Sequence, residues 1–313
     1  MKNEVIGFVG LGNVGSKLAK NLLKKSNKIY LFDKDKKKYL NFKDSAFHKC
    51  KKLEEITSNA SIIITCLPSP SAIDNVIKIL LPTINKRHLW IEMSTTDKNE
   101  MIRLSKEIKK KGASVLECPI TGGEHRAKSG NISILCSGLK KDFKRAFPFL
   151  KLIGHKILFC GKIGNASILK IITNYLASLH LLGISEALAV AKKNKLDLGL
   201  THKAIEISSG NSFVNDTETK VILSGSYDVG FTMDLVNKDV RLFKKLANEY
   251  NIPTDLGNIV QRIFKKGMKK YGKRSYSTSI VKLIEEECRI KMRANNFPKQ
   301  LVDIYQKQKG IEV

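Results

Sequence analysis

The fold is decided by a segment near the start of the chain, residues 5–15, which read VIGFVGLGNVG. Its first five residues are an apolar run of strand type, and glycines follow at positions 10, 12 and 15. Residues 16–25 have apolar side chains at helical spacing, and residues 28–32 are a second strand-like run that ends in Asp33. The order strand, glycine turn, helix, strand and acidic residue predicts a dinucleotide-binding turn in an α/β sheet.

The residue types in this turn have separate physical roles. Gly10 permits the tight turn, Gly12 lets the backbone approach a pyrophosphate, and Gly15 lets helix and strand pack closely. Asp33 follows at about the usual distance of ~20 residues, where a carboxylate accepts hydrogen bonds from the ribose hydroxyls of NAD. The sequence favours NAD, while Lys34 beside the acid leaves NADP open. The predicted cofactor-binding residues of this segment are Gly10, Leu11, Gly12, Asn13, Val14, Gly15 and Asp33.

Strand and helix patterns continue to alternate up to residue 160, which predicts a doubly wound parallel sheet. Several of the predicted strands end in polar or glycine-rich residues. Because the carboxyl ends of parallel strands meet at one edge of a sheet, these loops predict a single site. The loops are Cys66-Leu67-Pro68, Ser94-Thr95-Thr96 and Pro119-Ile120-Thr121-Gly122-Gly123.

After residue 160 the pattern changes to helices alone. The expected architecture is α/β: a Rossmann-type doubly wound parallel sheet in residues 1–162, followed by an all-helical C-terminal domain in residues 163–292. A long interdomain helix opens the second domain. Residues 293–313 are expected to be a basic tail with one short helix around residues 300–307.

The long helix carries Lys170 and Asn174 in otherwise apolar company. Burying a lysine is costly unless it has a partner or a role, and burial lowers the pKa of an amine. Residues four apart share one face of a helix. Such a lysine can protonate an aldehyde oxygen during reduction or accept the proton of an alcohol during oxidation. The structural alternatives are a lysine that extends to solvent from the helix start and an asparagine that makes a packing hydrogen bond.

The composition disfavours several other classes of protein. The net charge of +27 comes from 56 basic and 29 acidic residues. The lysines are dispersed and lack interleaved aromatic residues, so solvated helix faces are favoured over a nucleic-acid site. The six cysteines form no C-x-x-C pair, so no metal site is expected and free thiols fit the cytoplasm. The N-terminal residues lack a signal-peptide pattern, and the polar residues of the long helix argue against a membrane span.

With these residues in place, the chain resembles the β-hydroxyacid dehydrogenase family up to about Lys291. Its first domain is also similar to that of 6-phosphogluconate dehydrogenases. Each motif is modest alone, and their order and spacing carry the resemblance. The motifs are the glycine turn, Cys66-Leu67-Pro68, Ser94-Thr95, Thr121-Gly122-Gly123 with Ala127 and Gly130, the set Gly161, Gly164, Lys170 and Asn174, Ser185-Glu186-Ala187-Leu188-Ala189, and Lys238-Asp239.

The resemblance implies an NAD(P)-dependent oxidoreductase that interconverts a small 3-hydroxy acid and its semialdehyde, of the 3-hydroxyisobutyrate or tartronate semialdehyde type. Lys170 would be the general acid and base, with Asn174 beside it. A homodimer or homotetramer acting on a small carboxylate-bearing substrate is implied, without nucleic acid or membrane. Further residues implied are Thr121, Gly122 and Gly123 for the substrate, and Leu67, Pro68, Ser94, Thr95 and Lys238 for the cofactor.

Some positions depart from the family pattern. Thr173 stands where an asparagine usually precedes Asn174, and Glu124-His125-Arg126 is more polar than the usual small residues after the glycine pair. These departures bear on substrate identity more than on reaction type. Two alternatives stay open: an NADP-preferring reductase of another small aldehyde, and a catalytically silent polyanion-binding module on the same fold.

Overall fold

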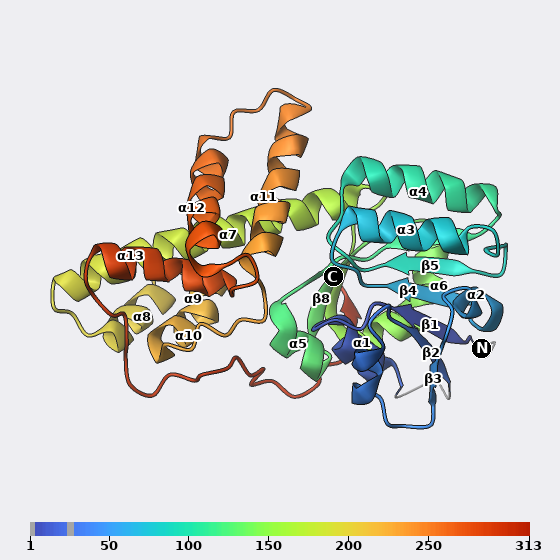
Figure 1. The fold of residues 1–313 in the computed structure, drawn as a ribbon, viewed down its shortest axis with the longest axis horizontal. Helices are drawn as coiled ribbons and strands as arrows, with labels where there is room; N and C mark the ends of the chain where they lie inside the picture. The colour runs from blue at the N-terminus through green and yellow to red at the C-terminus, as the bar shows by residue number, and fades with distance from the viewer. Residues whose placement is uncertain (1–3, 24–27) are drawn as a thin grey trace. The chain divides into compact units, whose positions relative to one another are not determined.

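The computed structural model describes residues 4–23 and 28–313, which form two compact units (Figure 1). The first unit ends at Lys170 and also includes Asp303–Val313, and the second is Ile171–Val302. The change of unit therefore falls inside the long helix, a few residues after the predicted boundary at 162/163. The predicted tail is divided, since its residues up to Val302 belong to the second unit and the rest to the first.

A single sheet organises the first unit, with the strand order β10-β9-β8-β6-β5-β4-β1-β2-β3 and β7 paired to β8 alone. The six neighbouring strands β6-β5-β4-β1-β2-β3 are parallel. From β1 the chain continues to β2 and β3 on one side and to β4, β5 and β6 on the other. The strands are β1 Ile6–Val9, β2 Ile29–Phe32, β3 Phe47–Lys49, β4 Ile62–Thr65, β5 Leu89–Glu92, β6 Ser114–Glu117, β7 Ile120–Thr121, β8 Ile132–Gly138, β9 Gly154–Phe159 and β10 Ile311–Glu312.

The last three strands, β8, β9 and β10, depart from the predicted all-parallel sheet because they run opposite to the others. β8 runs antiparallel to both β6 and β7, and β9 then runs parallel to β8. The segment between β6 and β8 contains only β7 and the seven-residue helix α5. Antiparallel neighbours accept a short connection, whereas a parallel pair needs a longer crossover.

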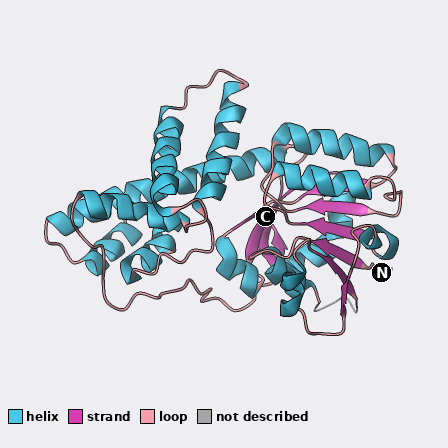
Figure 2. Ribbon diagram, viewed as in Figure 1, coloured by secondary structure: helices cyan, strands magenta, loops and turns pink. Residues whose placement is uncertain are grey.

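Helices cover both faces of this sheet, because side chains alternate along each buried strand. Ile62 and Ile64 pack in one core with α1, α5 and α6, while Ile63 packs in the opposite core with α2, α3 and α4. Figure 2 shows the strands gathered in this part of the chain. The helices are α1 Gly15–Leu22, η1 Lys36–Asn41, α2 Glu55–Asn59, α3 Pro70–Leu80, α4 Lys98–Lys110, α5 Gly123–Ser129 and α6 Lys140–Ile153. Lys24 and Lys25, predicted in the first helix, lie outside the described residues.

The second unit is built from helices around its own core, which includes Leu188, Val240 and Phe264. α7 is long and apolar enough to cross a membrane by length and composition alone. Residues 277–287 form η2 and α13, and residues 300–307, which were predicted to form a short helix, are not helical. The elements are α7 Asn165–Lys193, α8 Leu198–Glu206, α9 Phe213–Asp216, α10 Glu218–Ser224, α11 Met233–Asn248, α12 Asp255–Tyr271, η2 Ser277–Val281 and α13 Lys282–Glu287.

Candidate functional site

The glycine turn lies at the carboxyl end of β1, between β2 and β4. Gly10 has φ +97°, and a Cβ atom there would lie 2.3 Å from the carbonyl oxygen of Cys66. A Cβ atom at Gly15 would lie 2.1 Å from the carbonyl oxygen of Gly10, so the turn and helix α1 leave no room for larger residues. Gly12, by contrast, faces open space.

Helix α1 begins at Gly15 without a side-chain cap. The first amides of a helix carry partial positive charge and need acceptors, which a bound phosphate supplies. The exposed backbone at Gly12 and this uncapped helix start therefore fit the pyrophosphate of a dinucleotide.

Asp33 lies directly after β2 and is held against the glycine turn. Its Oδ2 accepts a hydrogen bond from the backbone amide of Leu11 at 2.7 Å, and its Oδ1 accepts one from the amide of Asp35 at 2.9 Å. The half-buried carboxylate is thereby fixed next to the turn, as binding of a ribose at this position requires.

The loops after β4 and β5 are tied to each other. The amide of Leu67 donates to Ser94 Oγ at 2.7 Å. Glu92, at the end of β5, accepts from the amide of Ser94 at 2.6 Å and from Thr65 Oγ1 at 2.5 Å. Glu92 is 1% exposed, and burial raises the pKa of its carboxyl to about 7. Pro68 and Thr95 follow in the same two loops.

The equivalent position on β6 is Glu117, which the sequence interpretation did not single out. Its Oε1 accepts from the amides of Gly164 at 2.7 Å and Ala166 at 2.9 Å, and its Oε2 accepts from Ser167 Oγ at 2.9 Å. Burial raises the pKa of this carboxyl above its usual range although the hydrogen bonds oppose the shift. The signal in the sequence was an acidic residue inside an apolar strand, as it was for Glu92.

Helix α7 carries the predicted catalytic residues one turn apart. Lys170, in the first unit, is buried at 6% exposure. Asn174, in the second unit, donates from Nδ2 to Oδ2 of Asp239 at 2.6 Å. The other oxygen of Asp239, Oδ1, pairs with Lys238 Nζ at 2.9 Å, and Asp239 itself is 1% exposed. Asp239 thus joins two predicted site residues, although the sequence interpretation did not count it among them.

The predicted substrate loop follows β6 and includes β7. Gly122 and Gly123 have φ +117° and +85°, left-handed backbone conformations that favour glycine, and helix α5 begins at Gly123. A Cβ at Gly122 would lie 3.1 Å from Cδ of Arg126, so the arginine side chain lies over this glycine. Glu124 forms an ion pair with Lys17 of α1, which links the substrate loop to the cofactor helix.

The structure therefore places the predicted cofactor and substrate residues of the first unit along one edge of its sheet. Asn174 and Lys238 form their own cluster in the second unit through Asp239. Over residues 4–23 and 28–313, no group of three or more His, Cys, Asp or Glu side chains is arranged to hold a metal ion.

Two sequence families match the two parts of the chain. Residues 5–161 match the NAD binding domain of 6-phosphogluconate dehydrogenase, and residues 164–284 match the NAD-binding domain of NADP-dependent 3-hydroxyisobutyrate dehydrogenase. The mitochondrial 3-hydroxyisobutyrate dehydrogenase of Rattus norvegicus is 31% identical over 90% of this chain and 88% of its own. The 2-(hydroxymethyl)glutarate dehydrogenase of Eubacterium barkeri is 27% identical over 91% and 96%.

Solved structures show the same fold. A 3-hydroxyisobutyrate dehydrogenase of Mycobacterium tuberculosis, solved with L-serine, has a TM-score of 0.81 at 23% identity, covering 90% of this chain and 99% of that one. Psf3, solved with NADP⁺ and 2-OPP, has a TM-score of 0.83 at 20% identity, covering 89% and 99%. An imine reductase from Myxococcus stipitatus is more distant, with a TM-score of 0.61 over 90% and 99%.

Proposed function

This chain belongs to the β-hydroxyacid dehydrogenase family, an NAD(P)-dependent oxidoreductase group acting on CH–OH, and from that premise we propose its substrate class and catalytic residues. The substrate is a small 3-hydroxy acid, of the 3-hydroxyisobutyrate or tartronate semialdehyde type, interconverted with its semialdehyde. Lys170 is the general acid and base. The observation that carries this proposal is the burial of Lys170 on α7, one turn before Asn174.

The protein's part of the reaction concerns one proton and the position of the substrate. The nicotinamide, when bound, gives or takes the hydride. Lys170 donates a proton to the aldehyde oxygen in reduction and removes the hydroxyl proton in oxidation. Because Lys170 is buried, its ammonium acts on that oxygen in a region from which water is largely excluded. Asn174, held by Asp239, hydrogen-bonds the same substrate oxygen.

Substrate and cofactor binding are assigned to the loops. The amides of Gly122 and Gly123 with the hydroxyl of Thr121 bind the carboxylate, since backbone amides exposed in a turn can bind an anion. Asp33 binds the adenosine ribose and favours NAD, and Lys238, held by Asp239, contacts the cofactor. Leu67, Pro68, Ser94 and Thr95 line the nicotinamide side.

The proposal is tested with a panel of small 3-hydroxy acids and semialdehydes, each with NAD(H) and NADP(H), followed by absorbance of the reduced cofactor. We expect Lys170→Ala to reduce kcat by about 10²- to 10⁴-fold, the usual contribution of a general acid or base. Lys192→Ala, at an exposed position of the same helix, is the matched control and should retain activity. Full activity of Lys170→Ala would refute the mechanism, and turnover of none of the panel would refute the substrate class.

Two further assignments belong to the same proposal. The enzyme is a cytoplasmic homodimer or homotetramer, and its basic surface binds no specific nucleic acid. Light scattering of the purified protein tests the assembly. A salt-sensitive shift with mixed-sequence DNA would favour the polyanion-binding alternative.

A further inference from the structure

Strands β5 and β6 both end in a glutamate, and the two residues are partners in the sheet register. Glu92 and Glu117 are each 1% exposed. Two neighbouring buried carboxyl groups are costly unless hydrogen bonds compensate them. The proposed reaction uses neither group, so the presence of both carboxyl groups in the core of the sheet needs another explanation.

Glu117 holds the start of α7. Its oxygens accept from the amides of Gly164 and Ala166 and from the hydroxyl of Ser167. A carboxylate at a helix N-terminus satisfies amides that the helix cannot pair and interacts favourably with its dipole. Lys170 lies less than one turn beyond Ser167. The position of its amine therefore depends on the hydrogen bonds that anchor the start of α7 to Glu117.

Glu92 holds the loops of the cofactor side. It accepts from the amide of Ser94, whose hydroxyl in turn accepts from the amide of Leu67. Its second oxygen accepts from Thr65 Oγ1, which accepts from Trp90 Nε1 at 2.8 Å. The loops after β4 and β5 are therefore fixed through one carboxyl group.

We propose that Glu92 and Glu117 are paired positioning residues that hold the cofactor loops in register with the helix bearing Lys170. They reach the reacting atoms only through Ser94 and α7. Because Glu92 and Glu117 are neighbours on β5 and β6, the same rigid sheet fixes the positions of both the cofactor loops and the start of α7. This inference rests on the proposed function, since it assigns the purpose of the alignment to proton transfer at Lys170.

The test compares Glu117→Gln and Glu92→Gln with Asp142→Asn. Asp142 is a suitable control because it is also buried and accepts from Ser114 Oγ at 2.8 Å, but at the opposite end of β6. Glutamine keeps the shape of the side chain and offers one acceptor oxygen in place of two. Thermal unfolding of all three variants gives the stability loss common to any buried carboxyl group.

The two site variants should differ in kind. We expect Glu117→Gln to lower kcat by about 10- to 100-fold with unchanged calorimetric Kd for NADH, because a small displacement of a catalytic group is enough for such a loss. Glu92→Gln should weaken NADH binding by about 10-fold, whereas Asp142→Asn should change neither quantity. Losses in the site variants no greater than those of Asp142→Asn would overturn the proposal.

A readout without turnover separates this proposal from the proposed function. Hydrogen exchange of the peptide that contains Gly164, Ala166 and Ser167 should quicken in Glu117→Gln and stay unchanged in Asp142→Asn. If no substrate is turned over but exchange quickens, the proposed function fails and the anchor stands. Unchanged exchange overturns the anchor whatever the substrate. If Glu117→Gln does not fold, Glu117→Asp, which keeps the charge and shortens the side chain, takes its place with the same expectations.

Discussion

At the residue scale, Asp33 combines a structural and a discriminating role. One of its oxygens binds the Leu11 amide of the glycine turn, and the other binds the amide of Asp35. Its charge therefore stands close to the place where a ribose 2′-substituent would lie. A 2′-phosphate would be repelled there, while a 2′-hydroxyl would donate a hydrogen bond.

We predict that Asp33→Asn lowers the ratio of kcat/KM for NAD over NADP by about 10-fold, because it removes the repulsion and keeps an acceptor oxygen. Steady-state kinetics with both cofactors measure the ratio. Asp35→Asn is the control, since Asp35 is exposed and only caps the short helix η1. Equal losses with both cofactors in Asp33→Asn would remove the ribose assignment.

The raised pKa of Glu92, about 7 against an ordinary value of 4.5, predicts a pH dependence of stability. Burial favours the protonated carboxyl in the folded state. Its stabilising contribution is complete below the unfolded value and is lost as pH rises through about 7. The difference is roughly 3 kcal/mol, since each pKa unit corresponds to about 1.4 kcal/mol.

The check is the difference in unfolding free energy between wild type and Glu92→Gln from pH 4.5 to pH 8. We expect the variant to gain on the wild type as pH rises, because glutamine does not titrate. Subtracting the two curves cancels other titrating groups. A difference that stays constant with pH would contradict the assignment of a raised pKa to this carboxyl.

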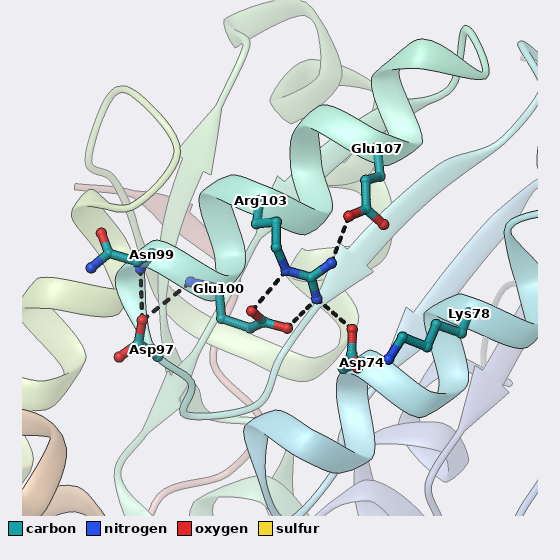
Figure 3. Close-up of polar contacts among 7 residues, drawn as sticks. All are labelled: Asp74, Lys78, Asp97, Asn99, Glu100, Arg103 and Glu107. Carbon is teal, nitrogen blue, oxygen red and sulfur yellow. Dashed lines mark hydrogen bonds and ion pairs between the residues drawn. The ribbon is translucent and has the colours of Figure 1, made fainter.

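At the element scale, α3 and α4 are joined by one arginine. Arg103 of α4 forms ion pairs with Glu100 and Glu107 on its own helix and with Asp74 on α3, as Figure 3 shows. The hydrogen bonds from Lys78 and Arg103 lower the pKa of Asp74 although burial opposes the shift. Together these contacts connect the outer edges of two helices whose inner faces already share a core.

We predict that Arg103→Ala destabilises the protein by about 1 kcal/mol, because partly exposed ion pairs contribute little each and a network somewhat more. Arg103→Lys should recover only part of the loss. Lysine keeps the positive charge but lacks the planar fork that reaches several carboxylates. Urea denaturation at low and at high salt measures both variants. A loss that is as large in 1 M salt would show that packing of the arginine stem, and not charge, stabilises this contact.

Sequence patterns predicted helices and strands best where the signal lies within a few neighbouring residues. The β1–α1–β2 unit and Asp33 were predicted because glycine spacing and apolar runs encode them locally. The sequence interpretation named no helix at α3, although Ser69 caps this helix and Pro70 stands in its first turn, where proline is favoured. The reversal of β8 was not encoded locally, since pairing direction depends on contacts with β6 and β7.

At the scale of the whole molecule, the C-terminal segment was the part least accessible to sequence patterns. Its hydrophilic residues were interpreted as a basic tail with a short helix. Instead, Asp303 accepts from Ser129 Oγ and Asn131 Nδ2, and Asn131 Oδ1 accepts from the amide of Gln308. Such contacts join residues more than 170 positions apart in the chain, and a local sequence pattern cannot predict them.

These contacts predict that the last residues stabilise the first unit. Deleting residues 303–313 removes the bonds of Asn131 and leaves the edge of β9 unpaired, because β10 pairs with β9 there. We expect a loss of about 2–3 kcal/mol from the unsatisfied groups, or a Tm lower by about 5–10 °C for a unit of this size.

The only tryptophan, Trp90, is buried in the first unit and makes that unit separately observable. Its fluorescence should report the lower Tm of the truncated chain, while far-ultraviolet circular dichroism should retain a transition from the helical second unit. Lys309→Ala, which removes an exposed side chain and keeps the backbone of the segment, should unfold like the wild type. A Trp90 transition that is unchanged by truncation would mean that the β9 edge and Asn131 are satisfied without the segment, and the stabilising role would be wrong.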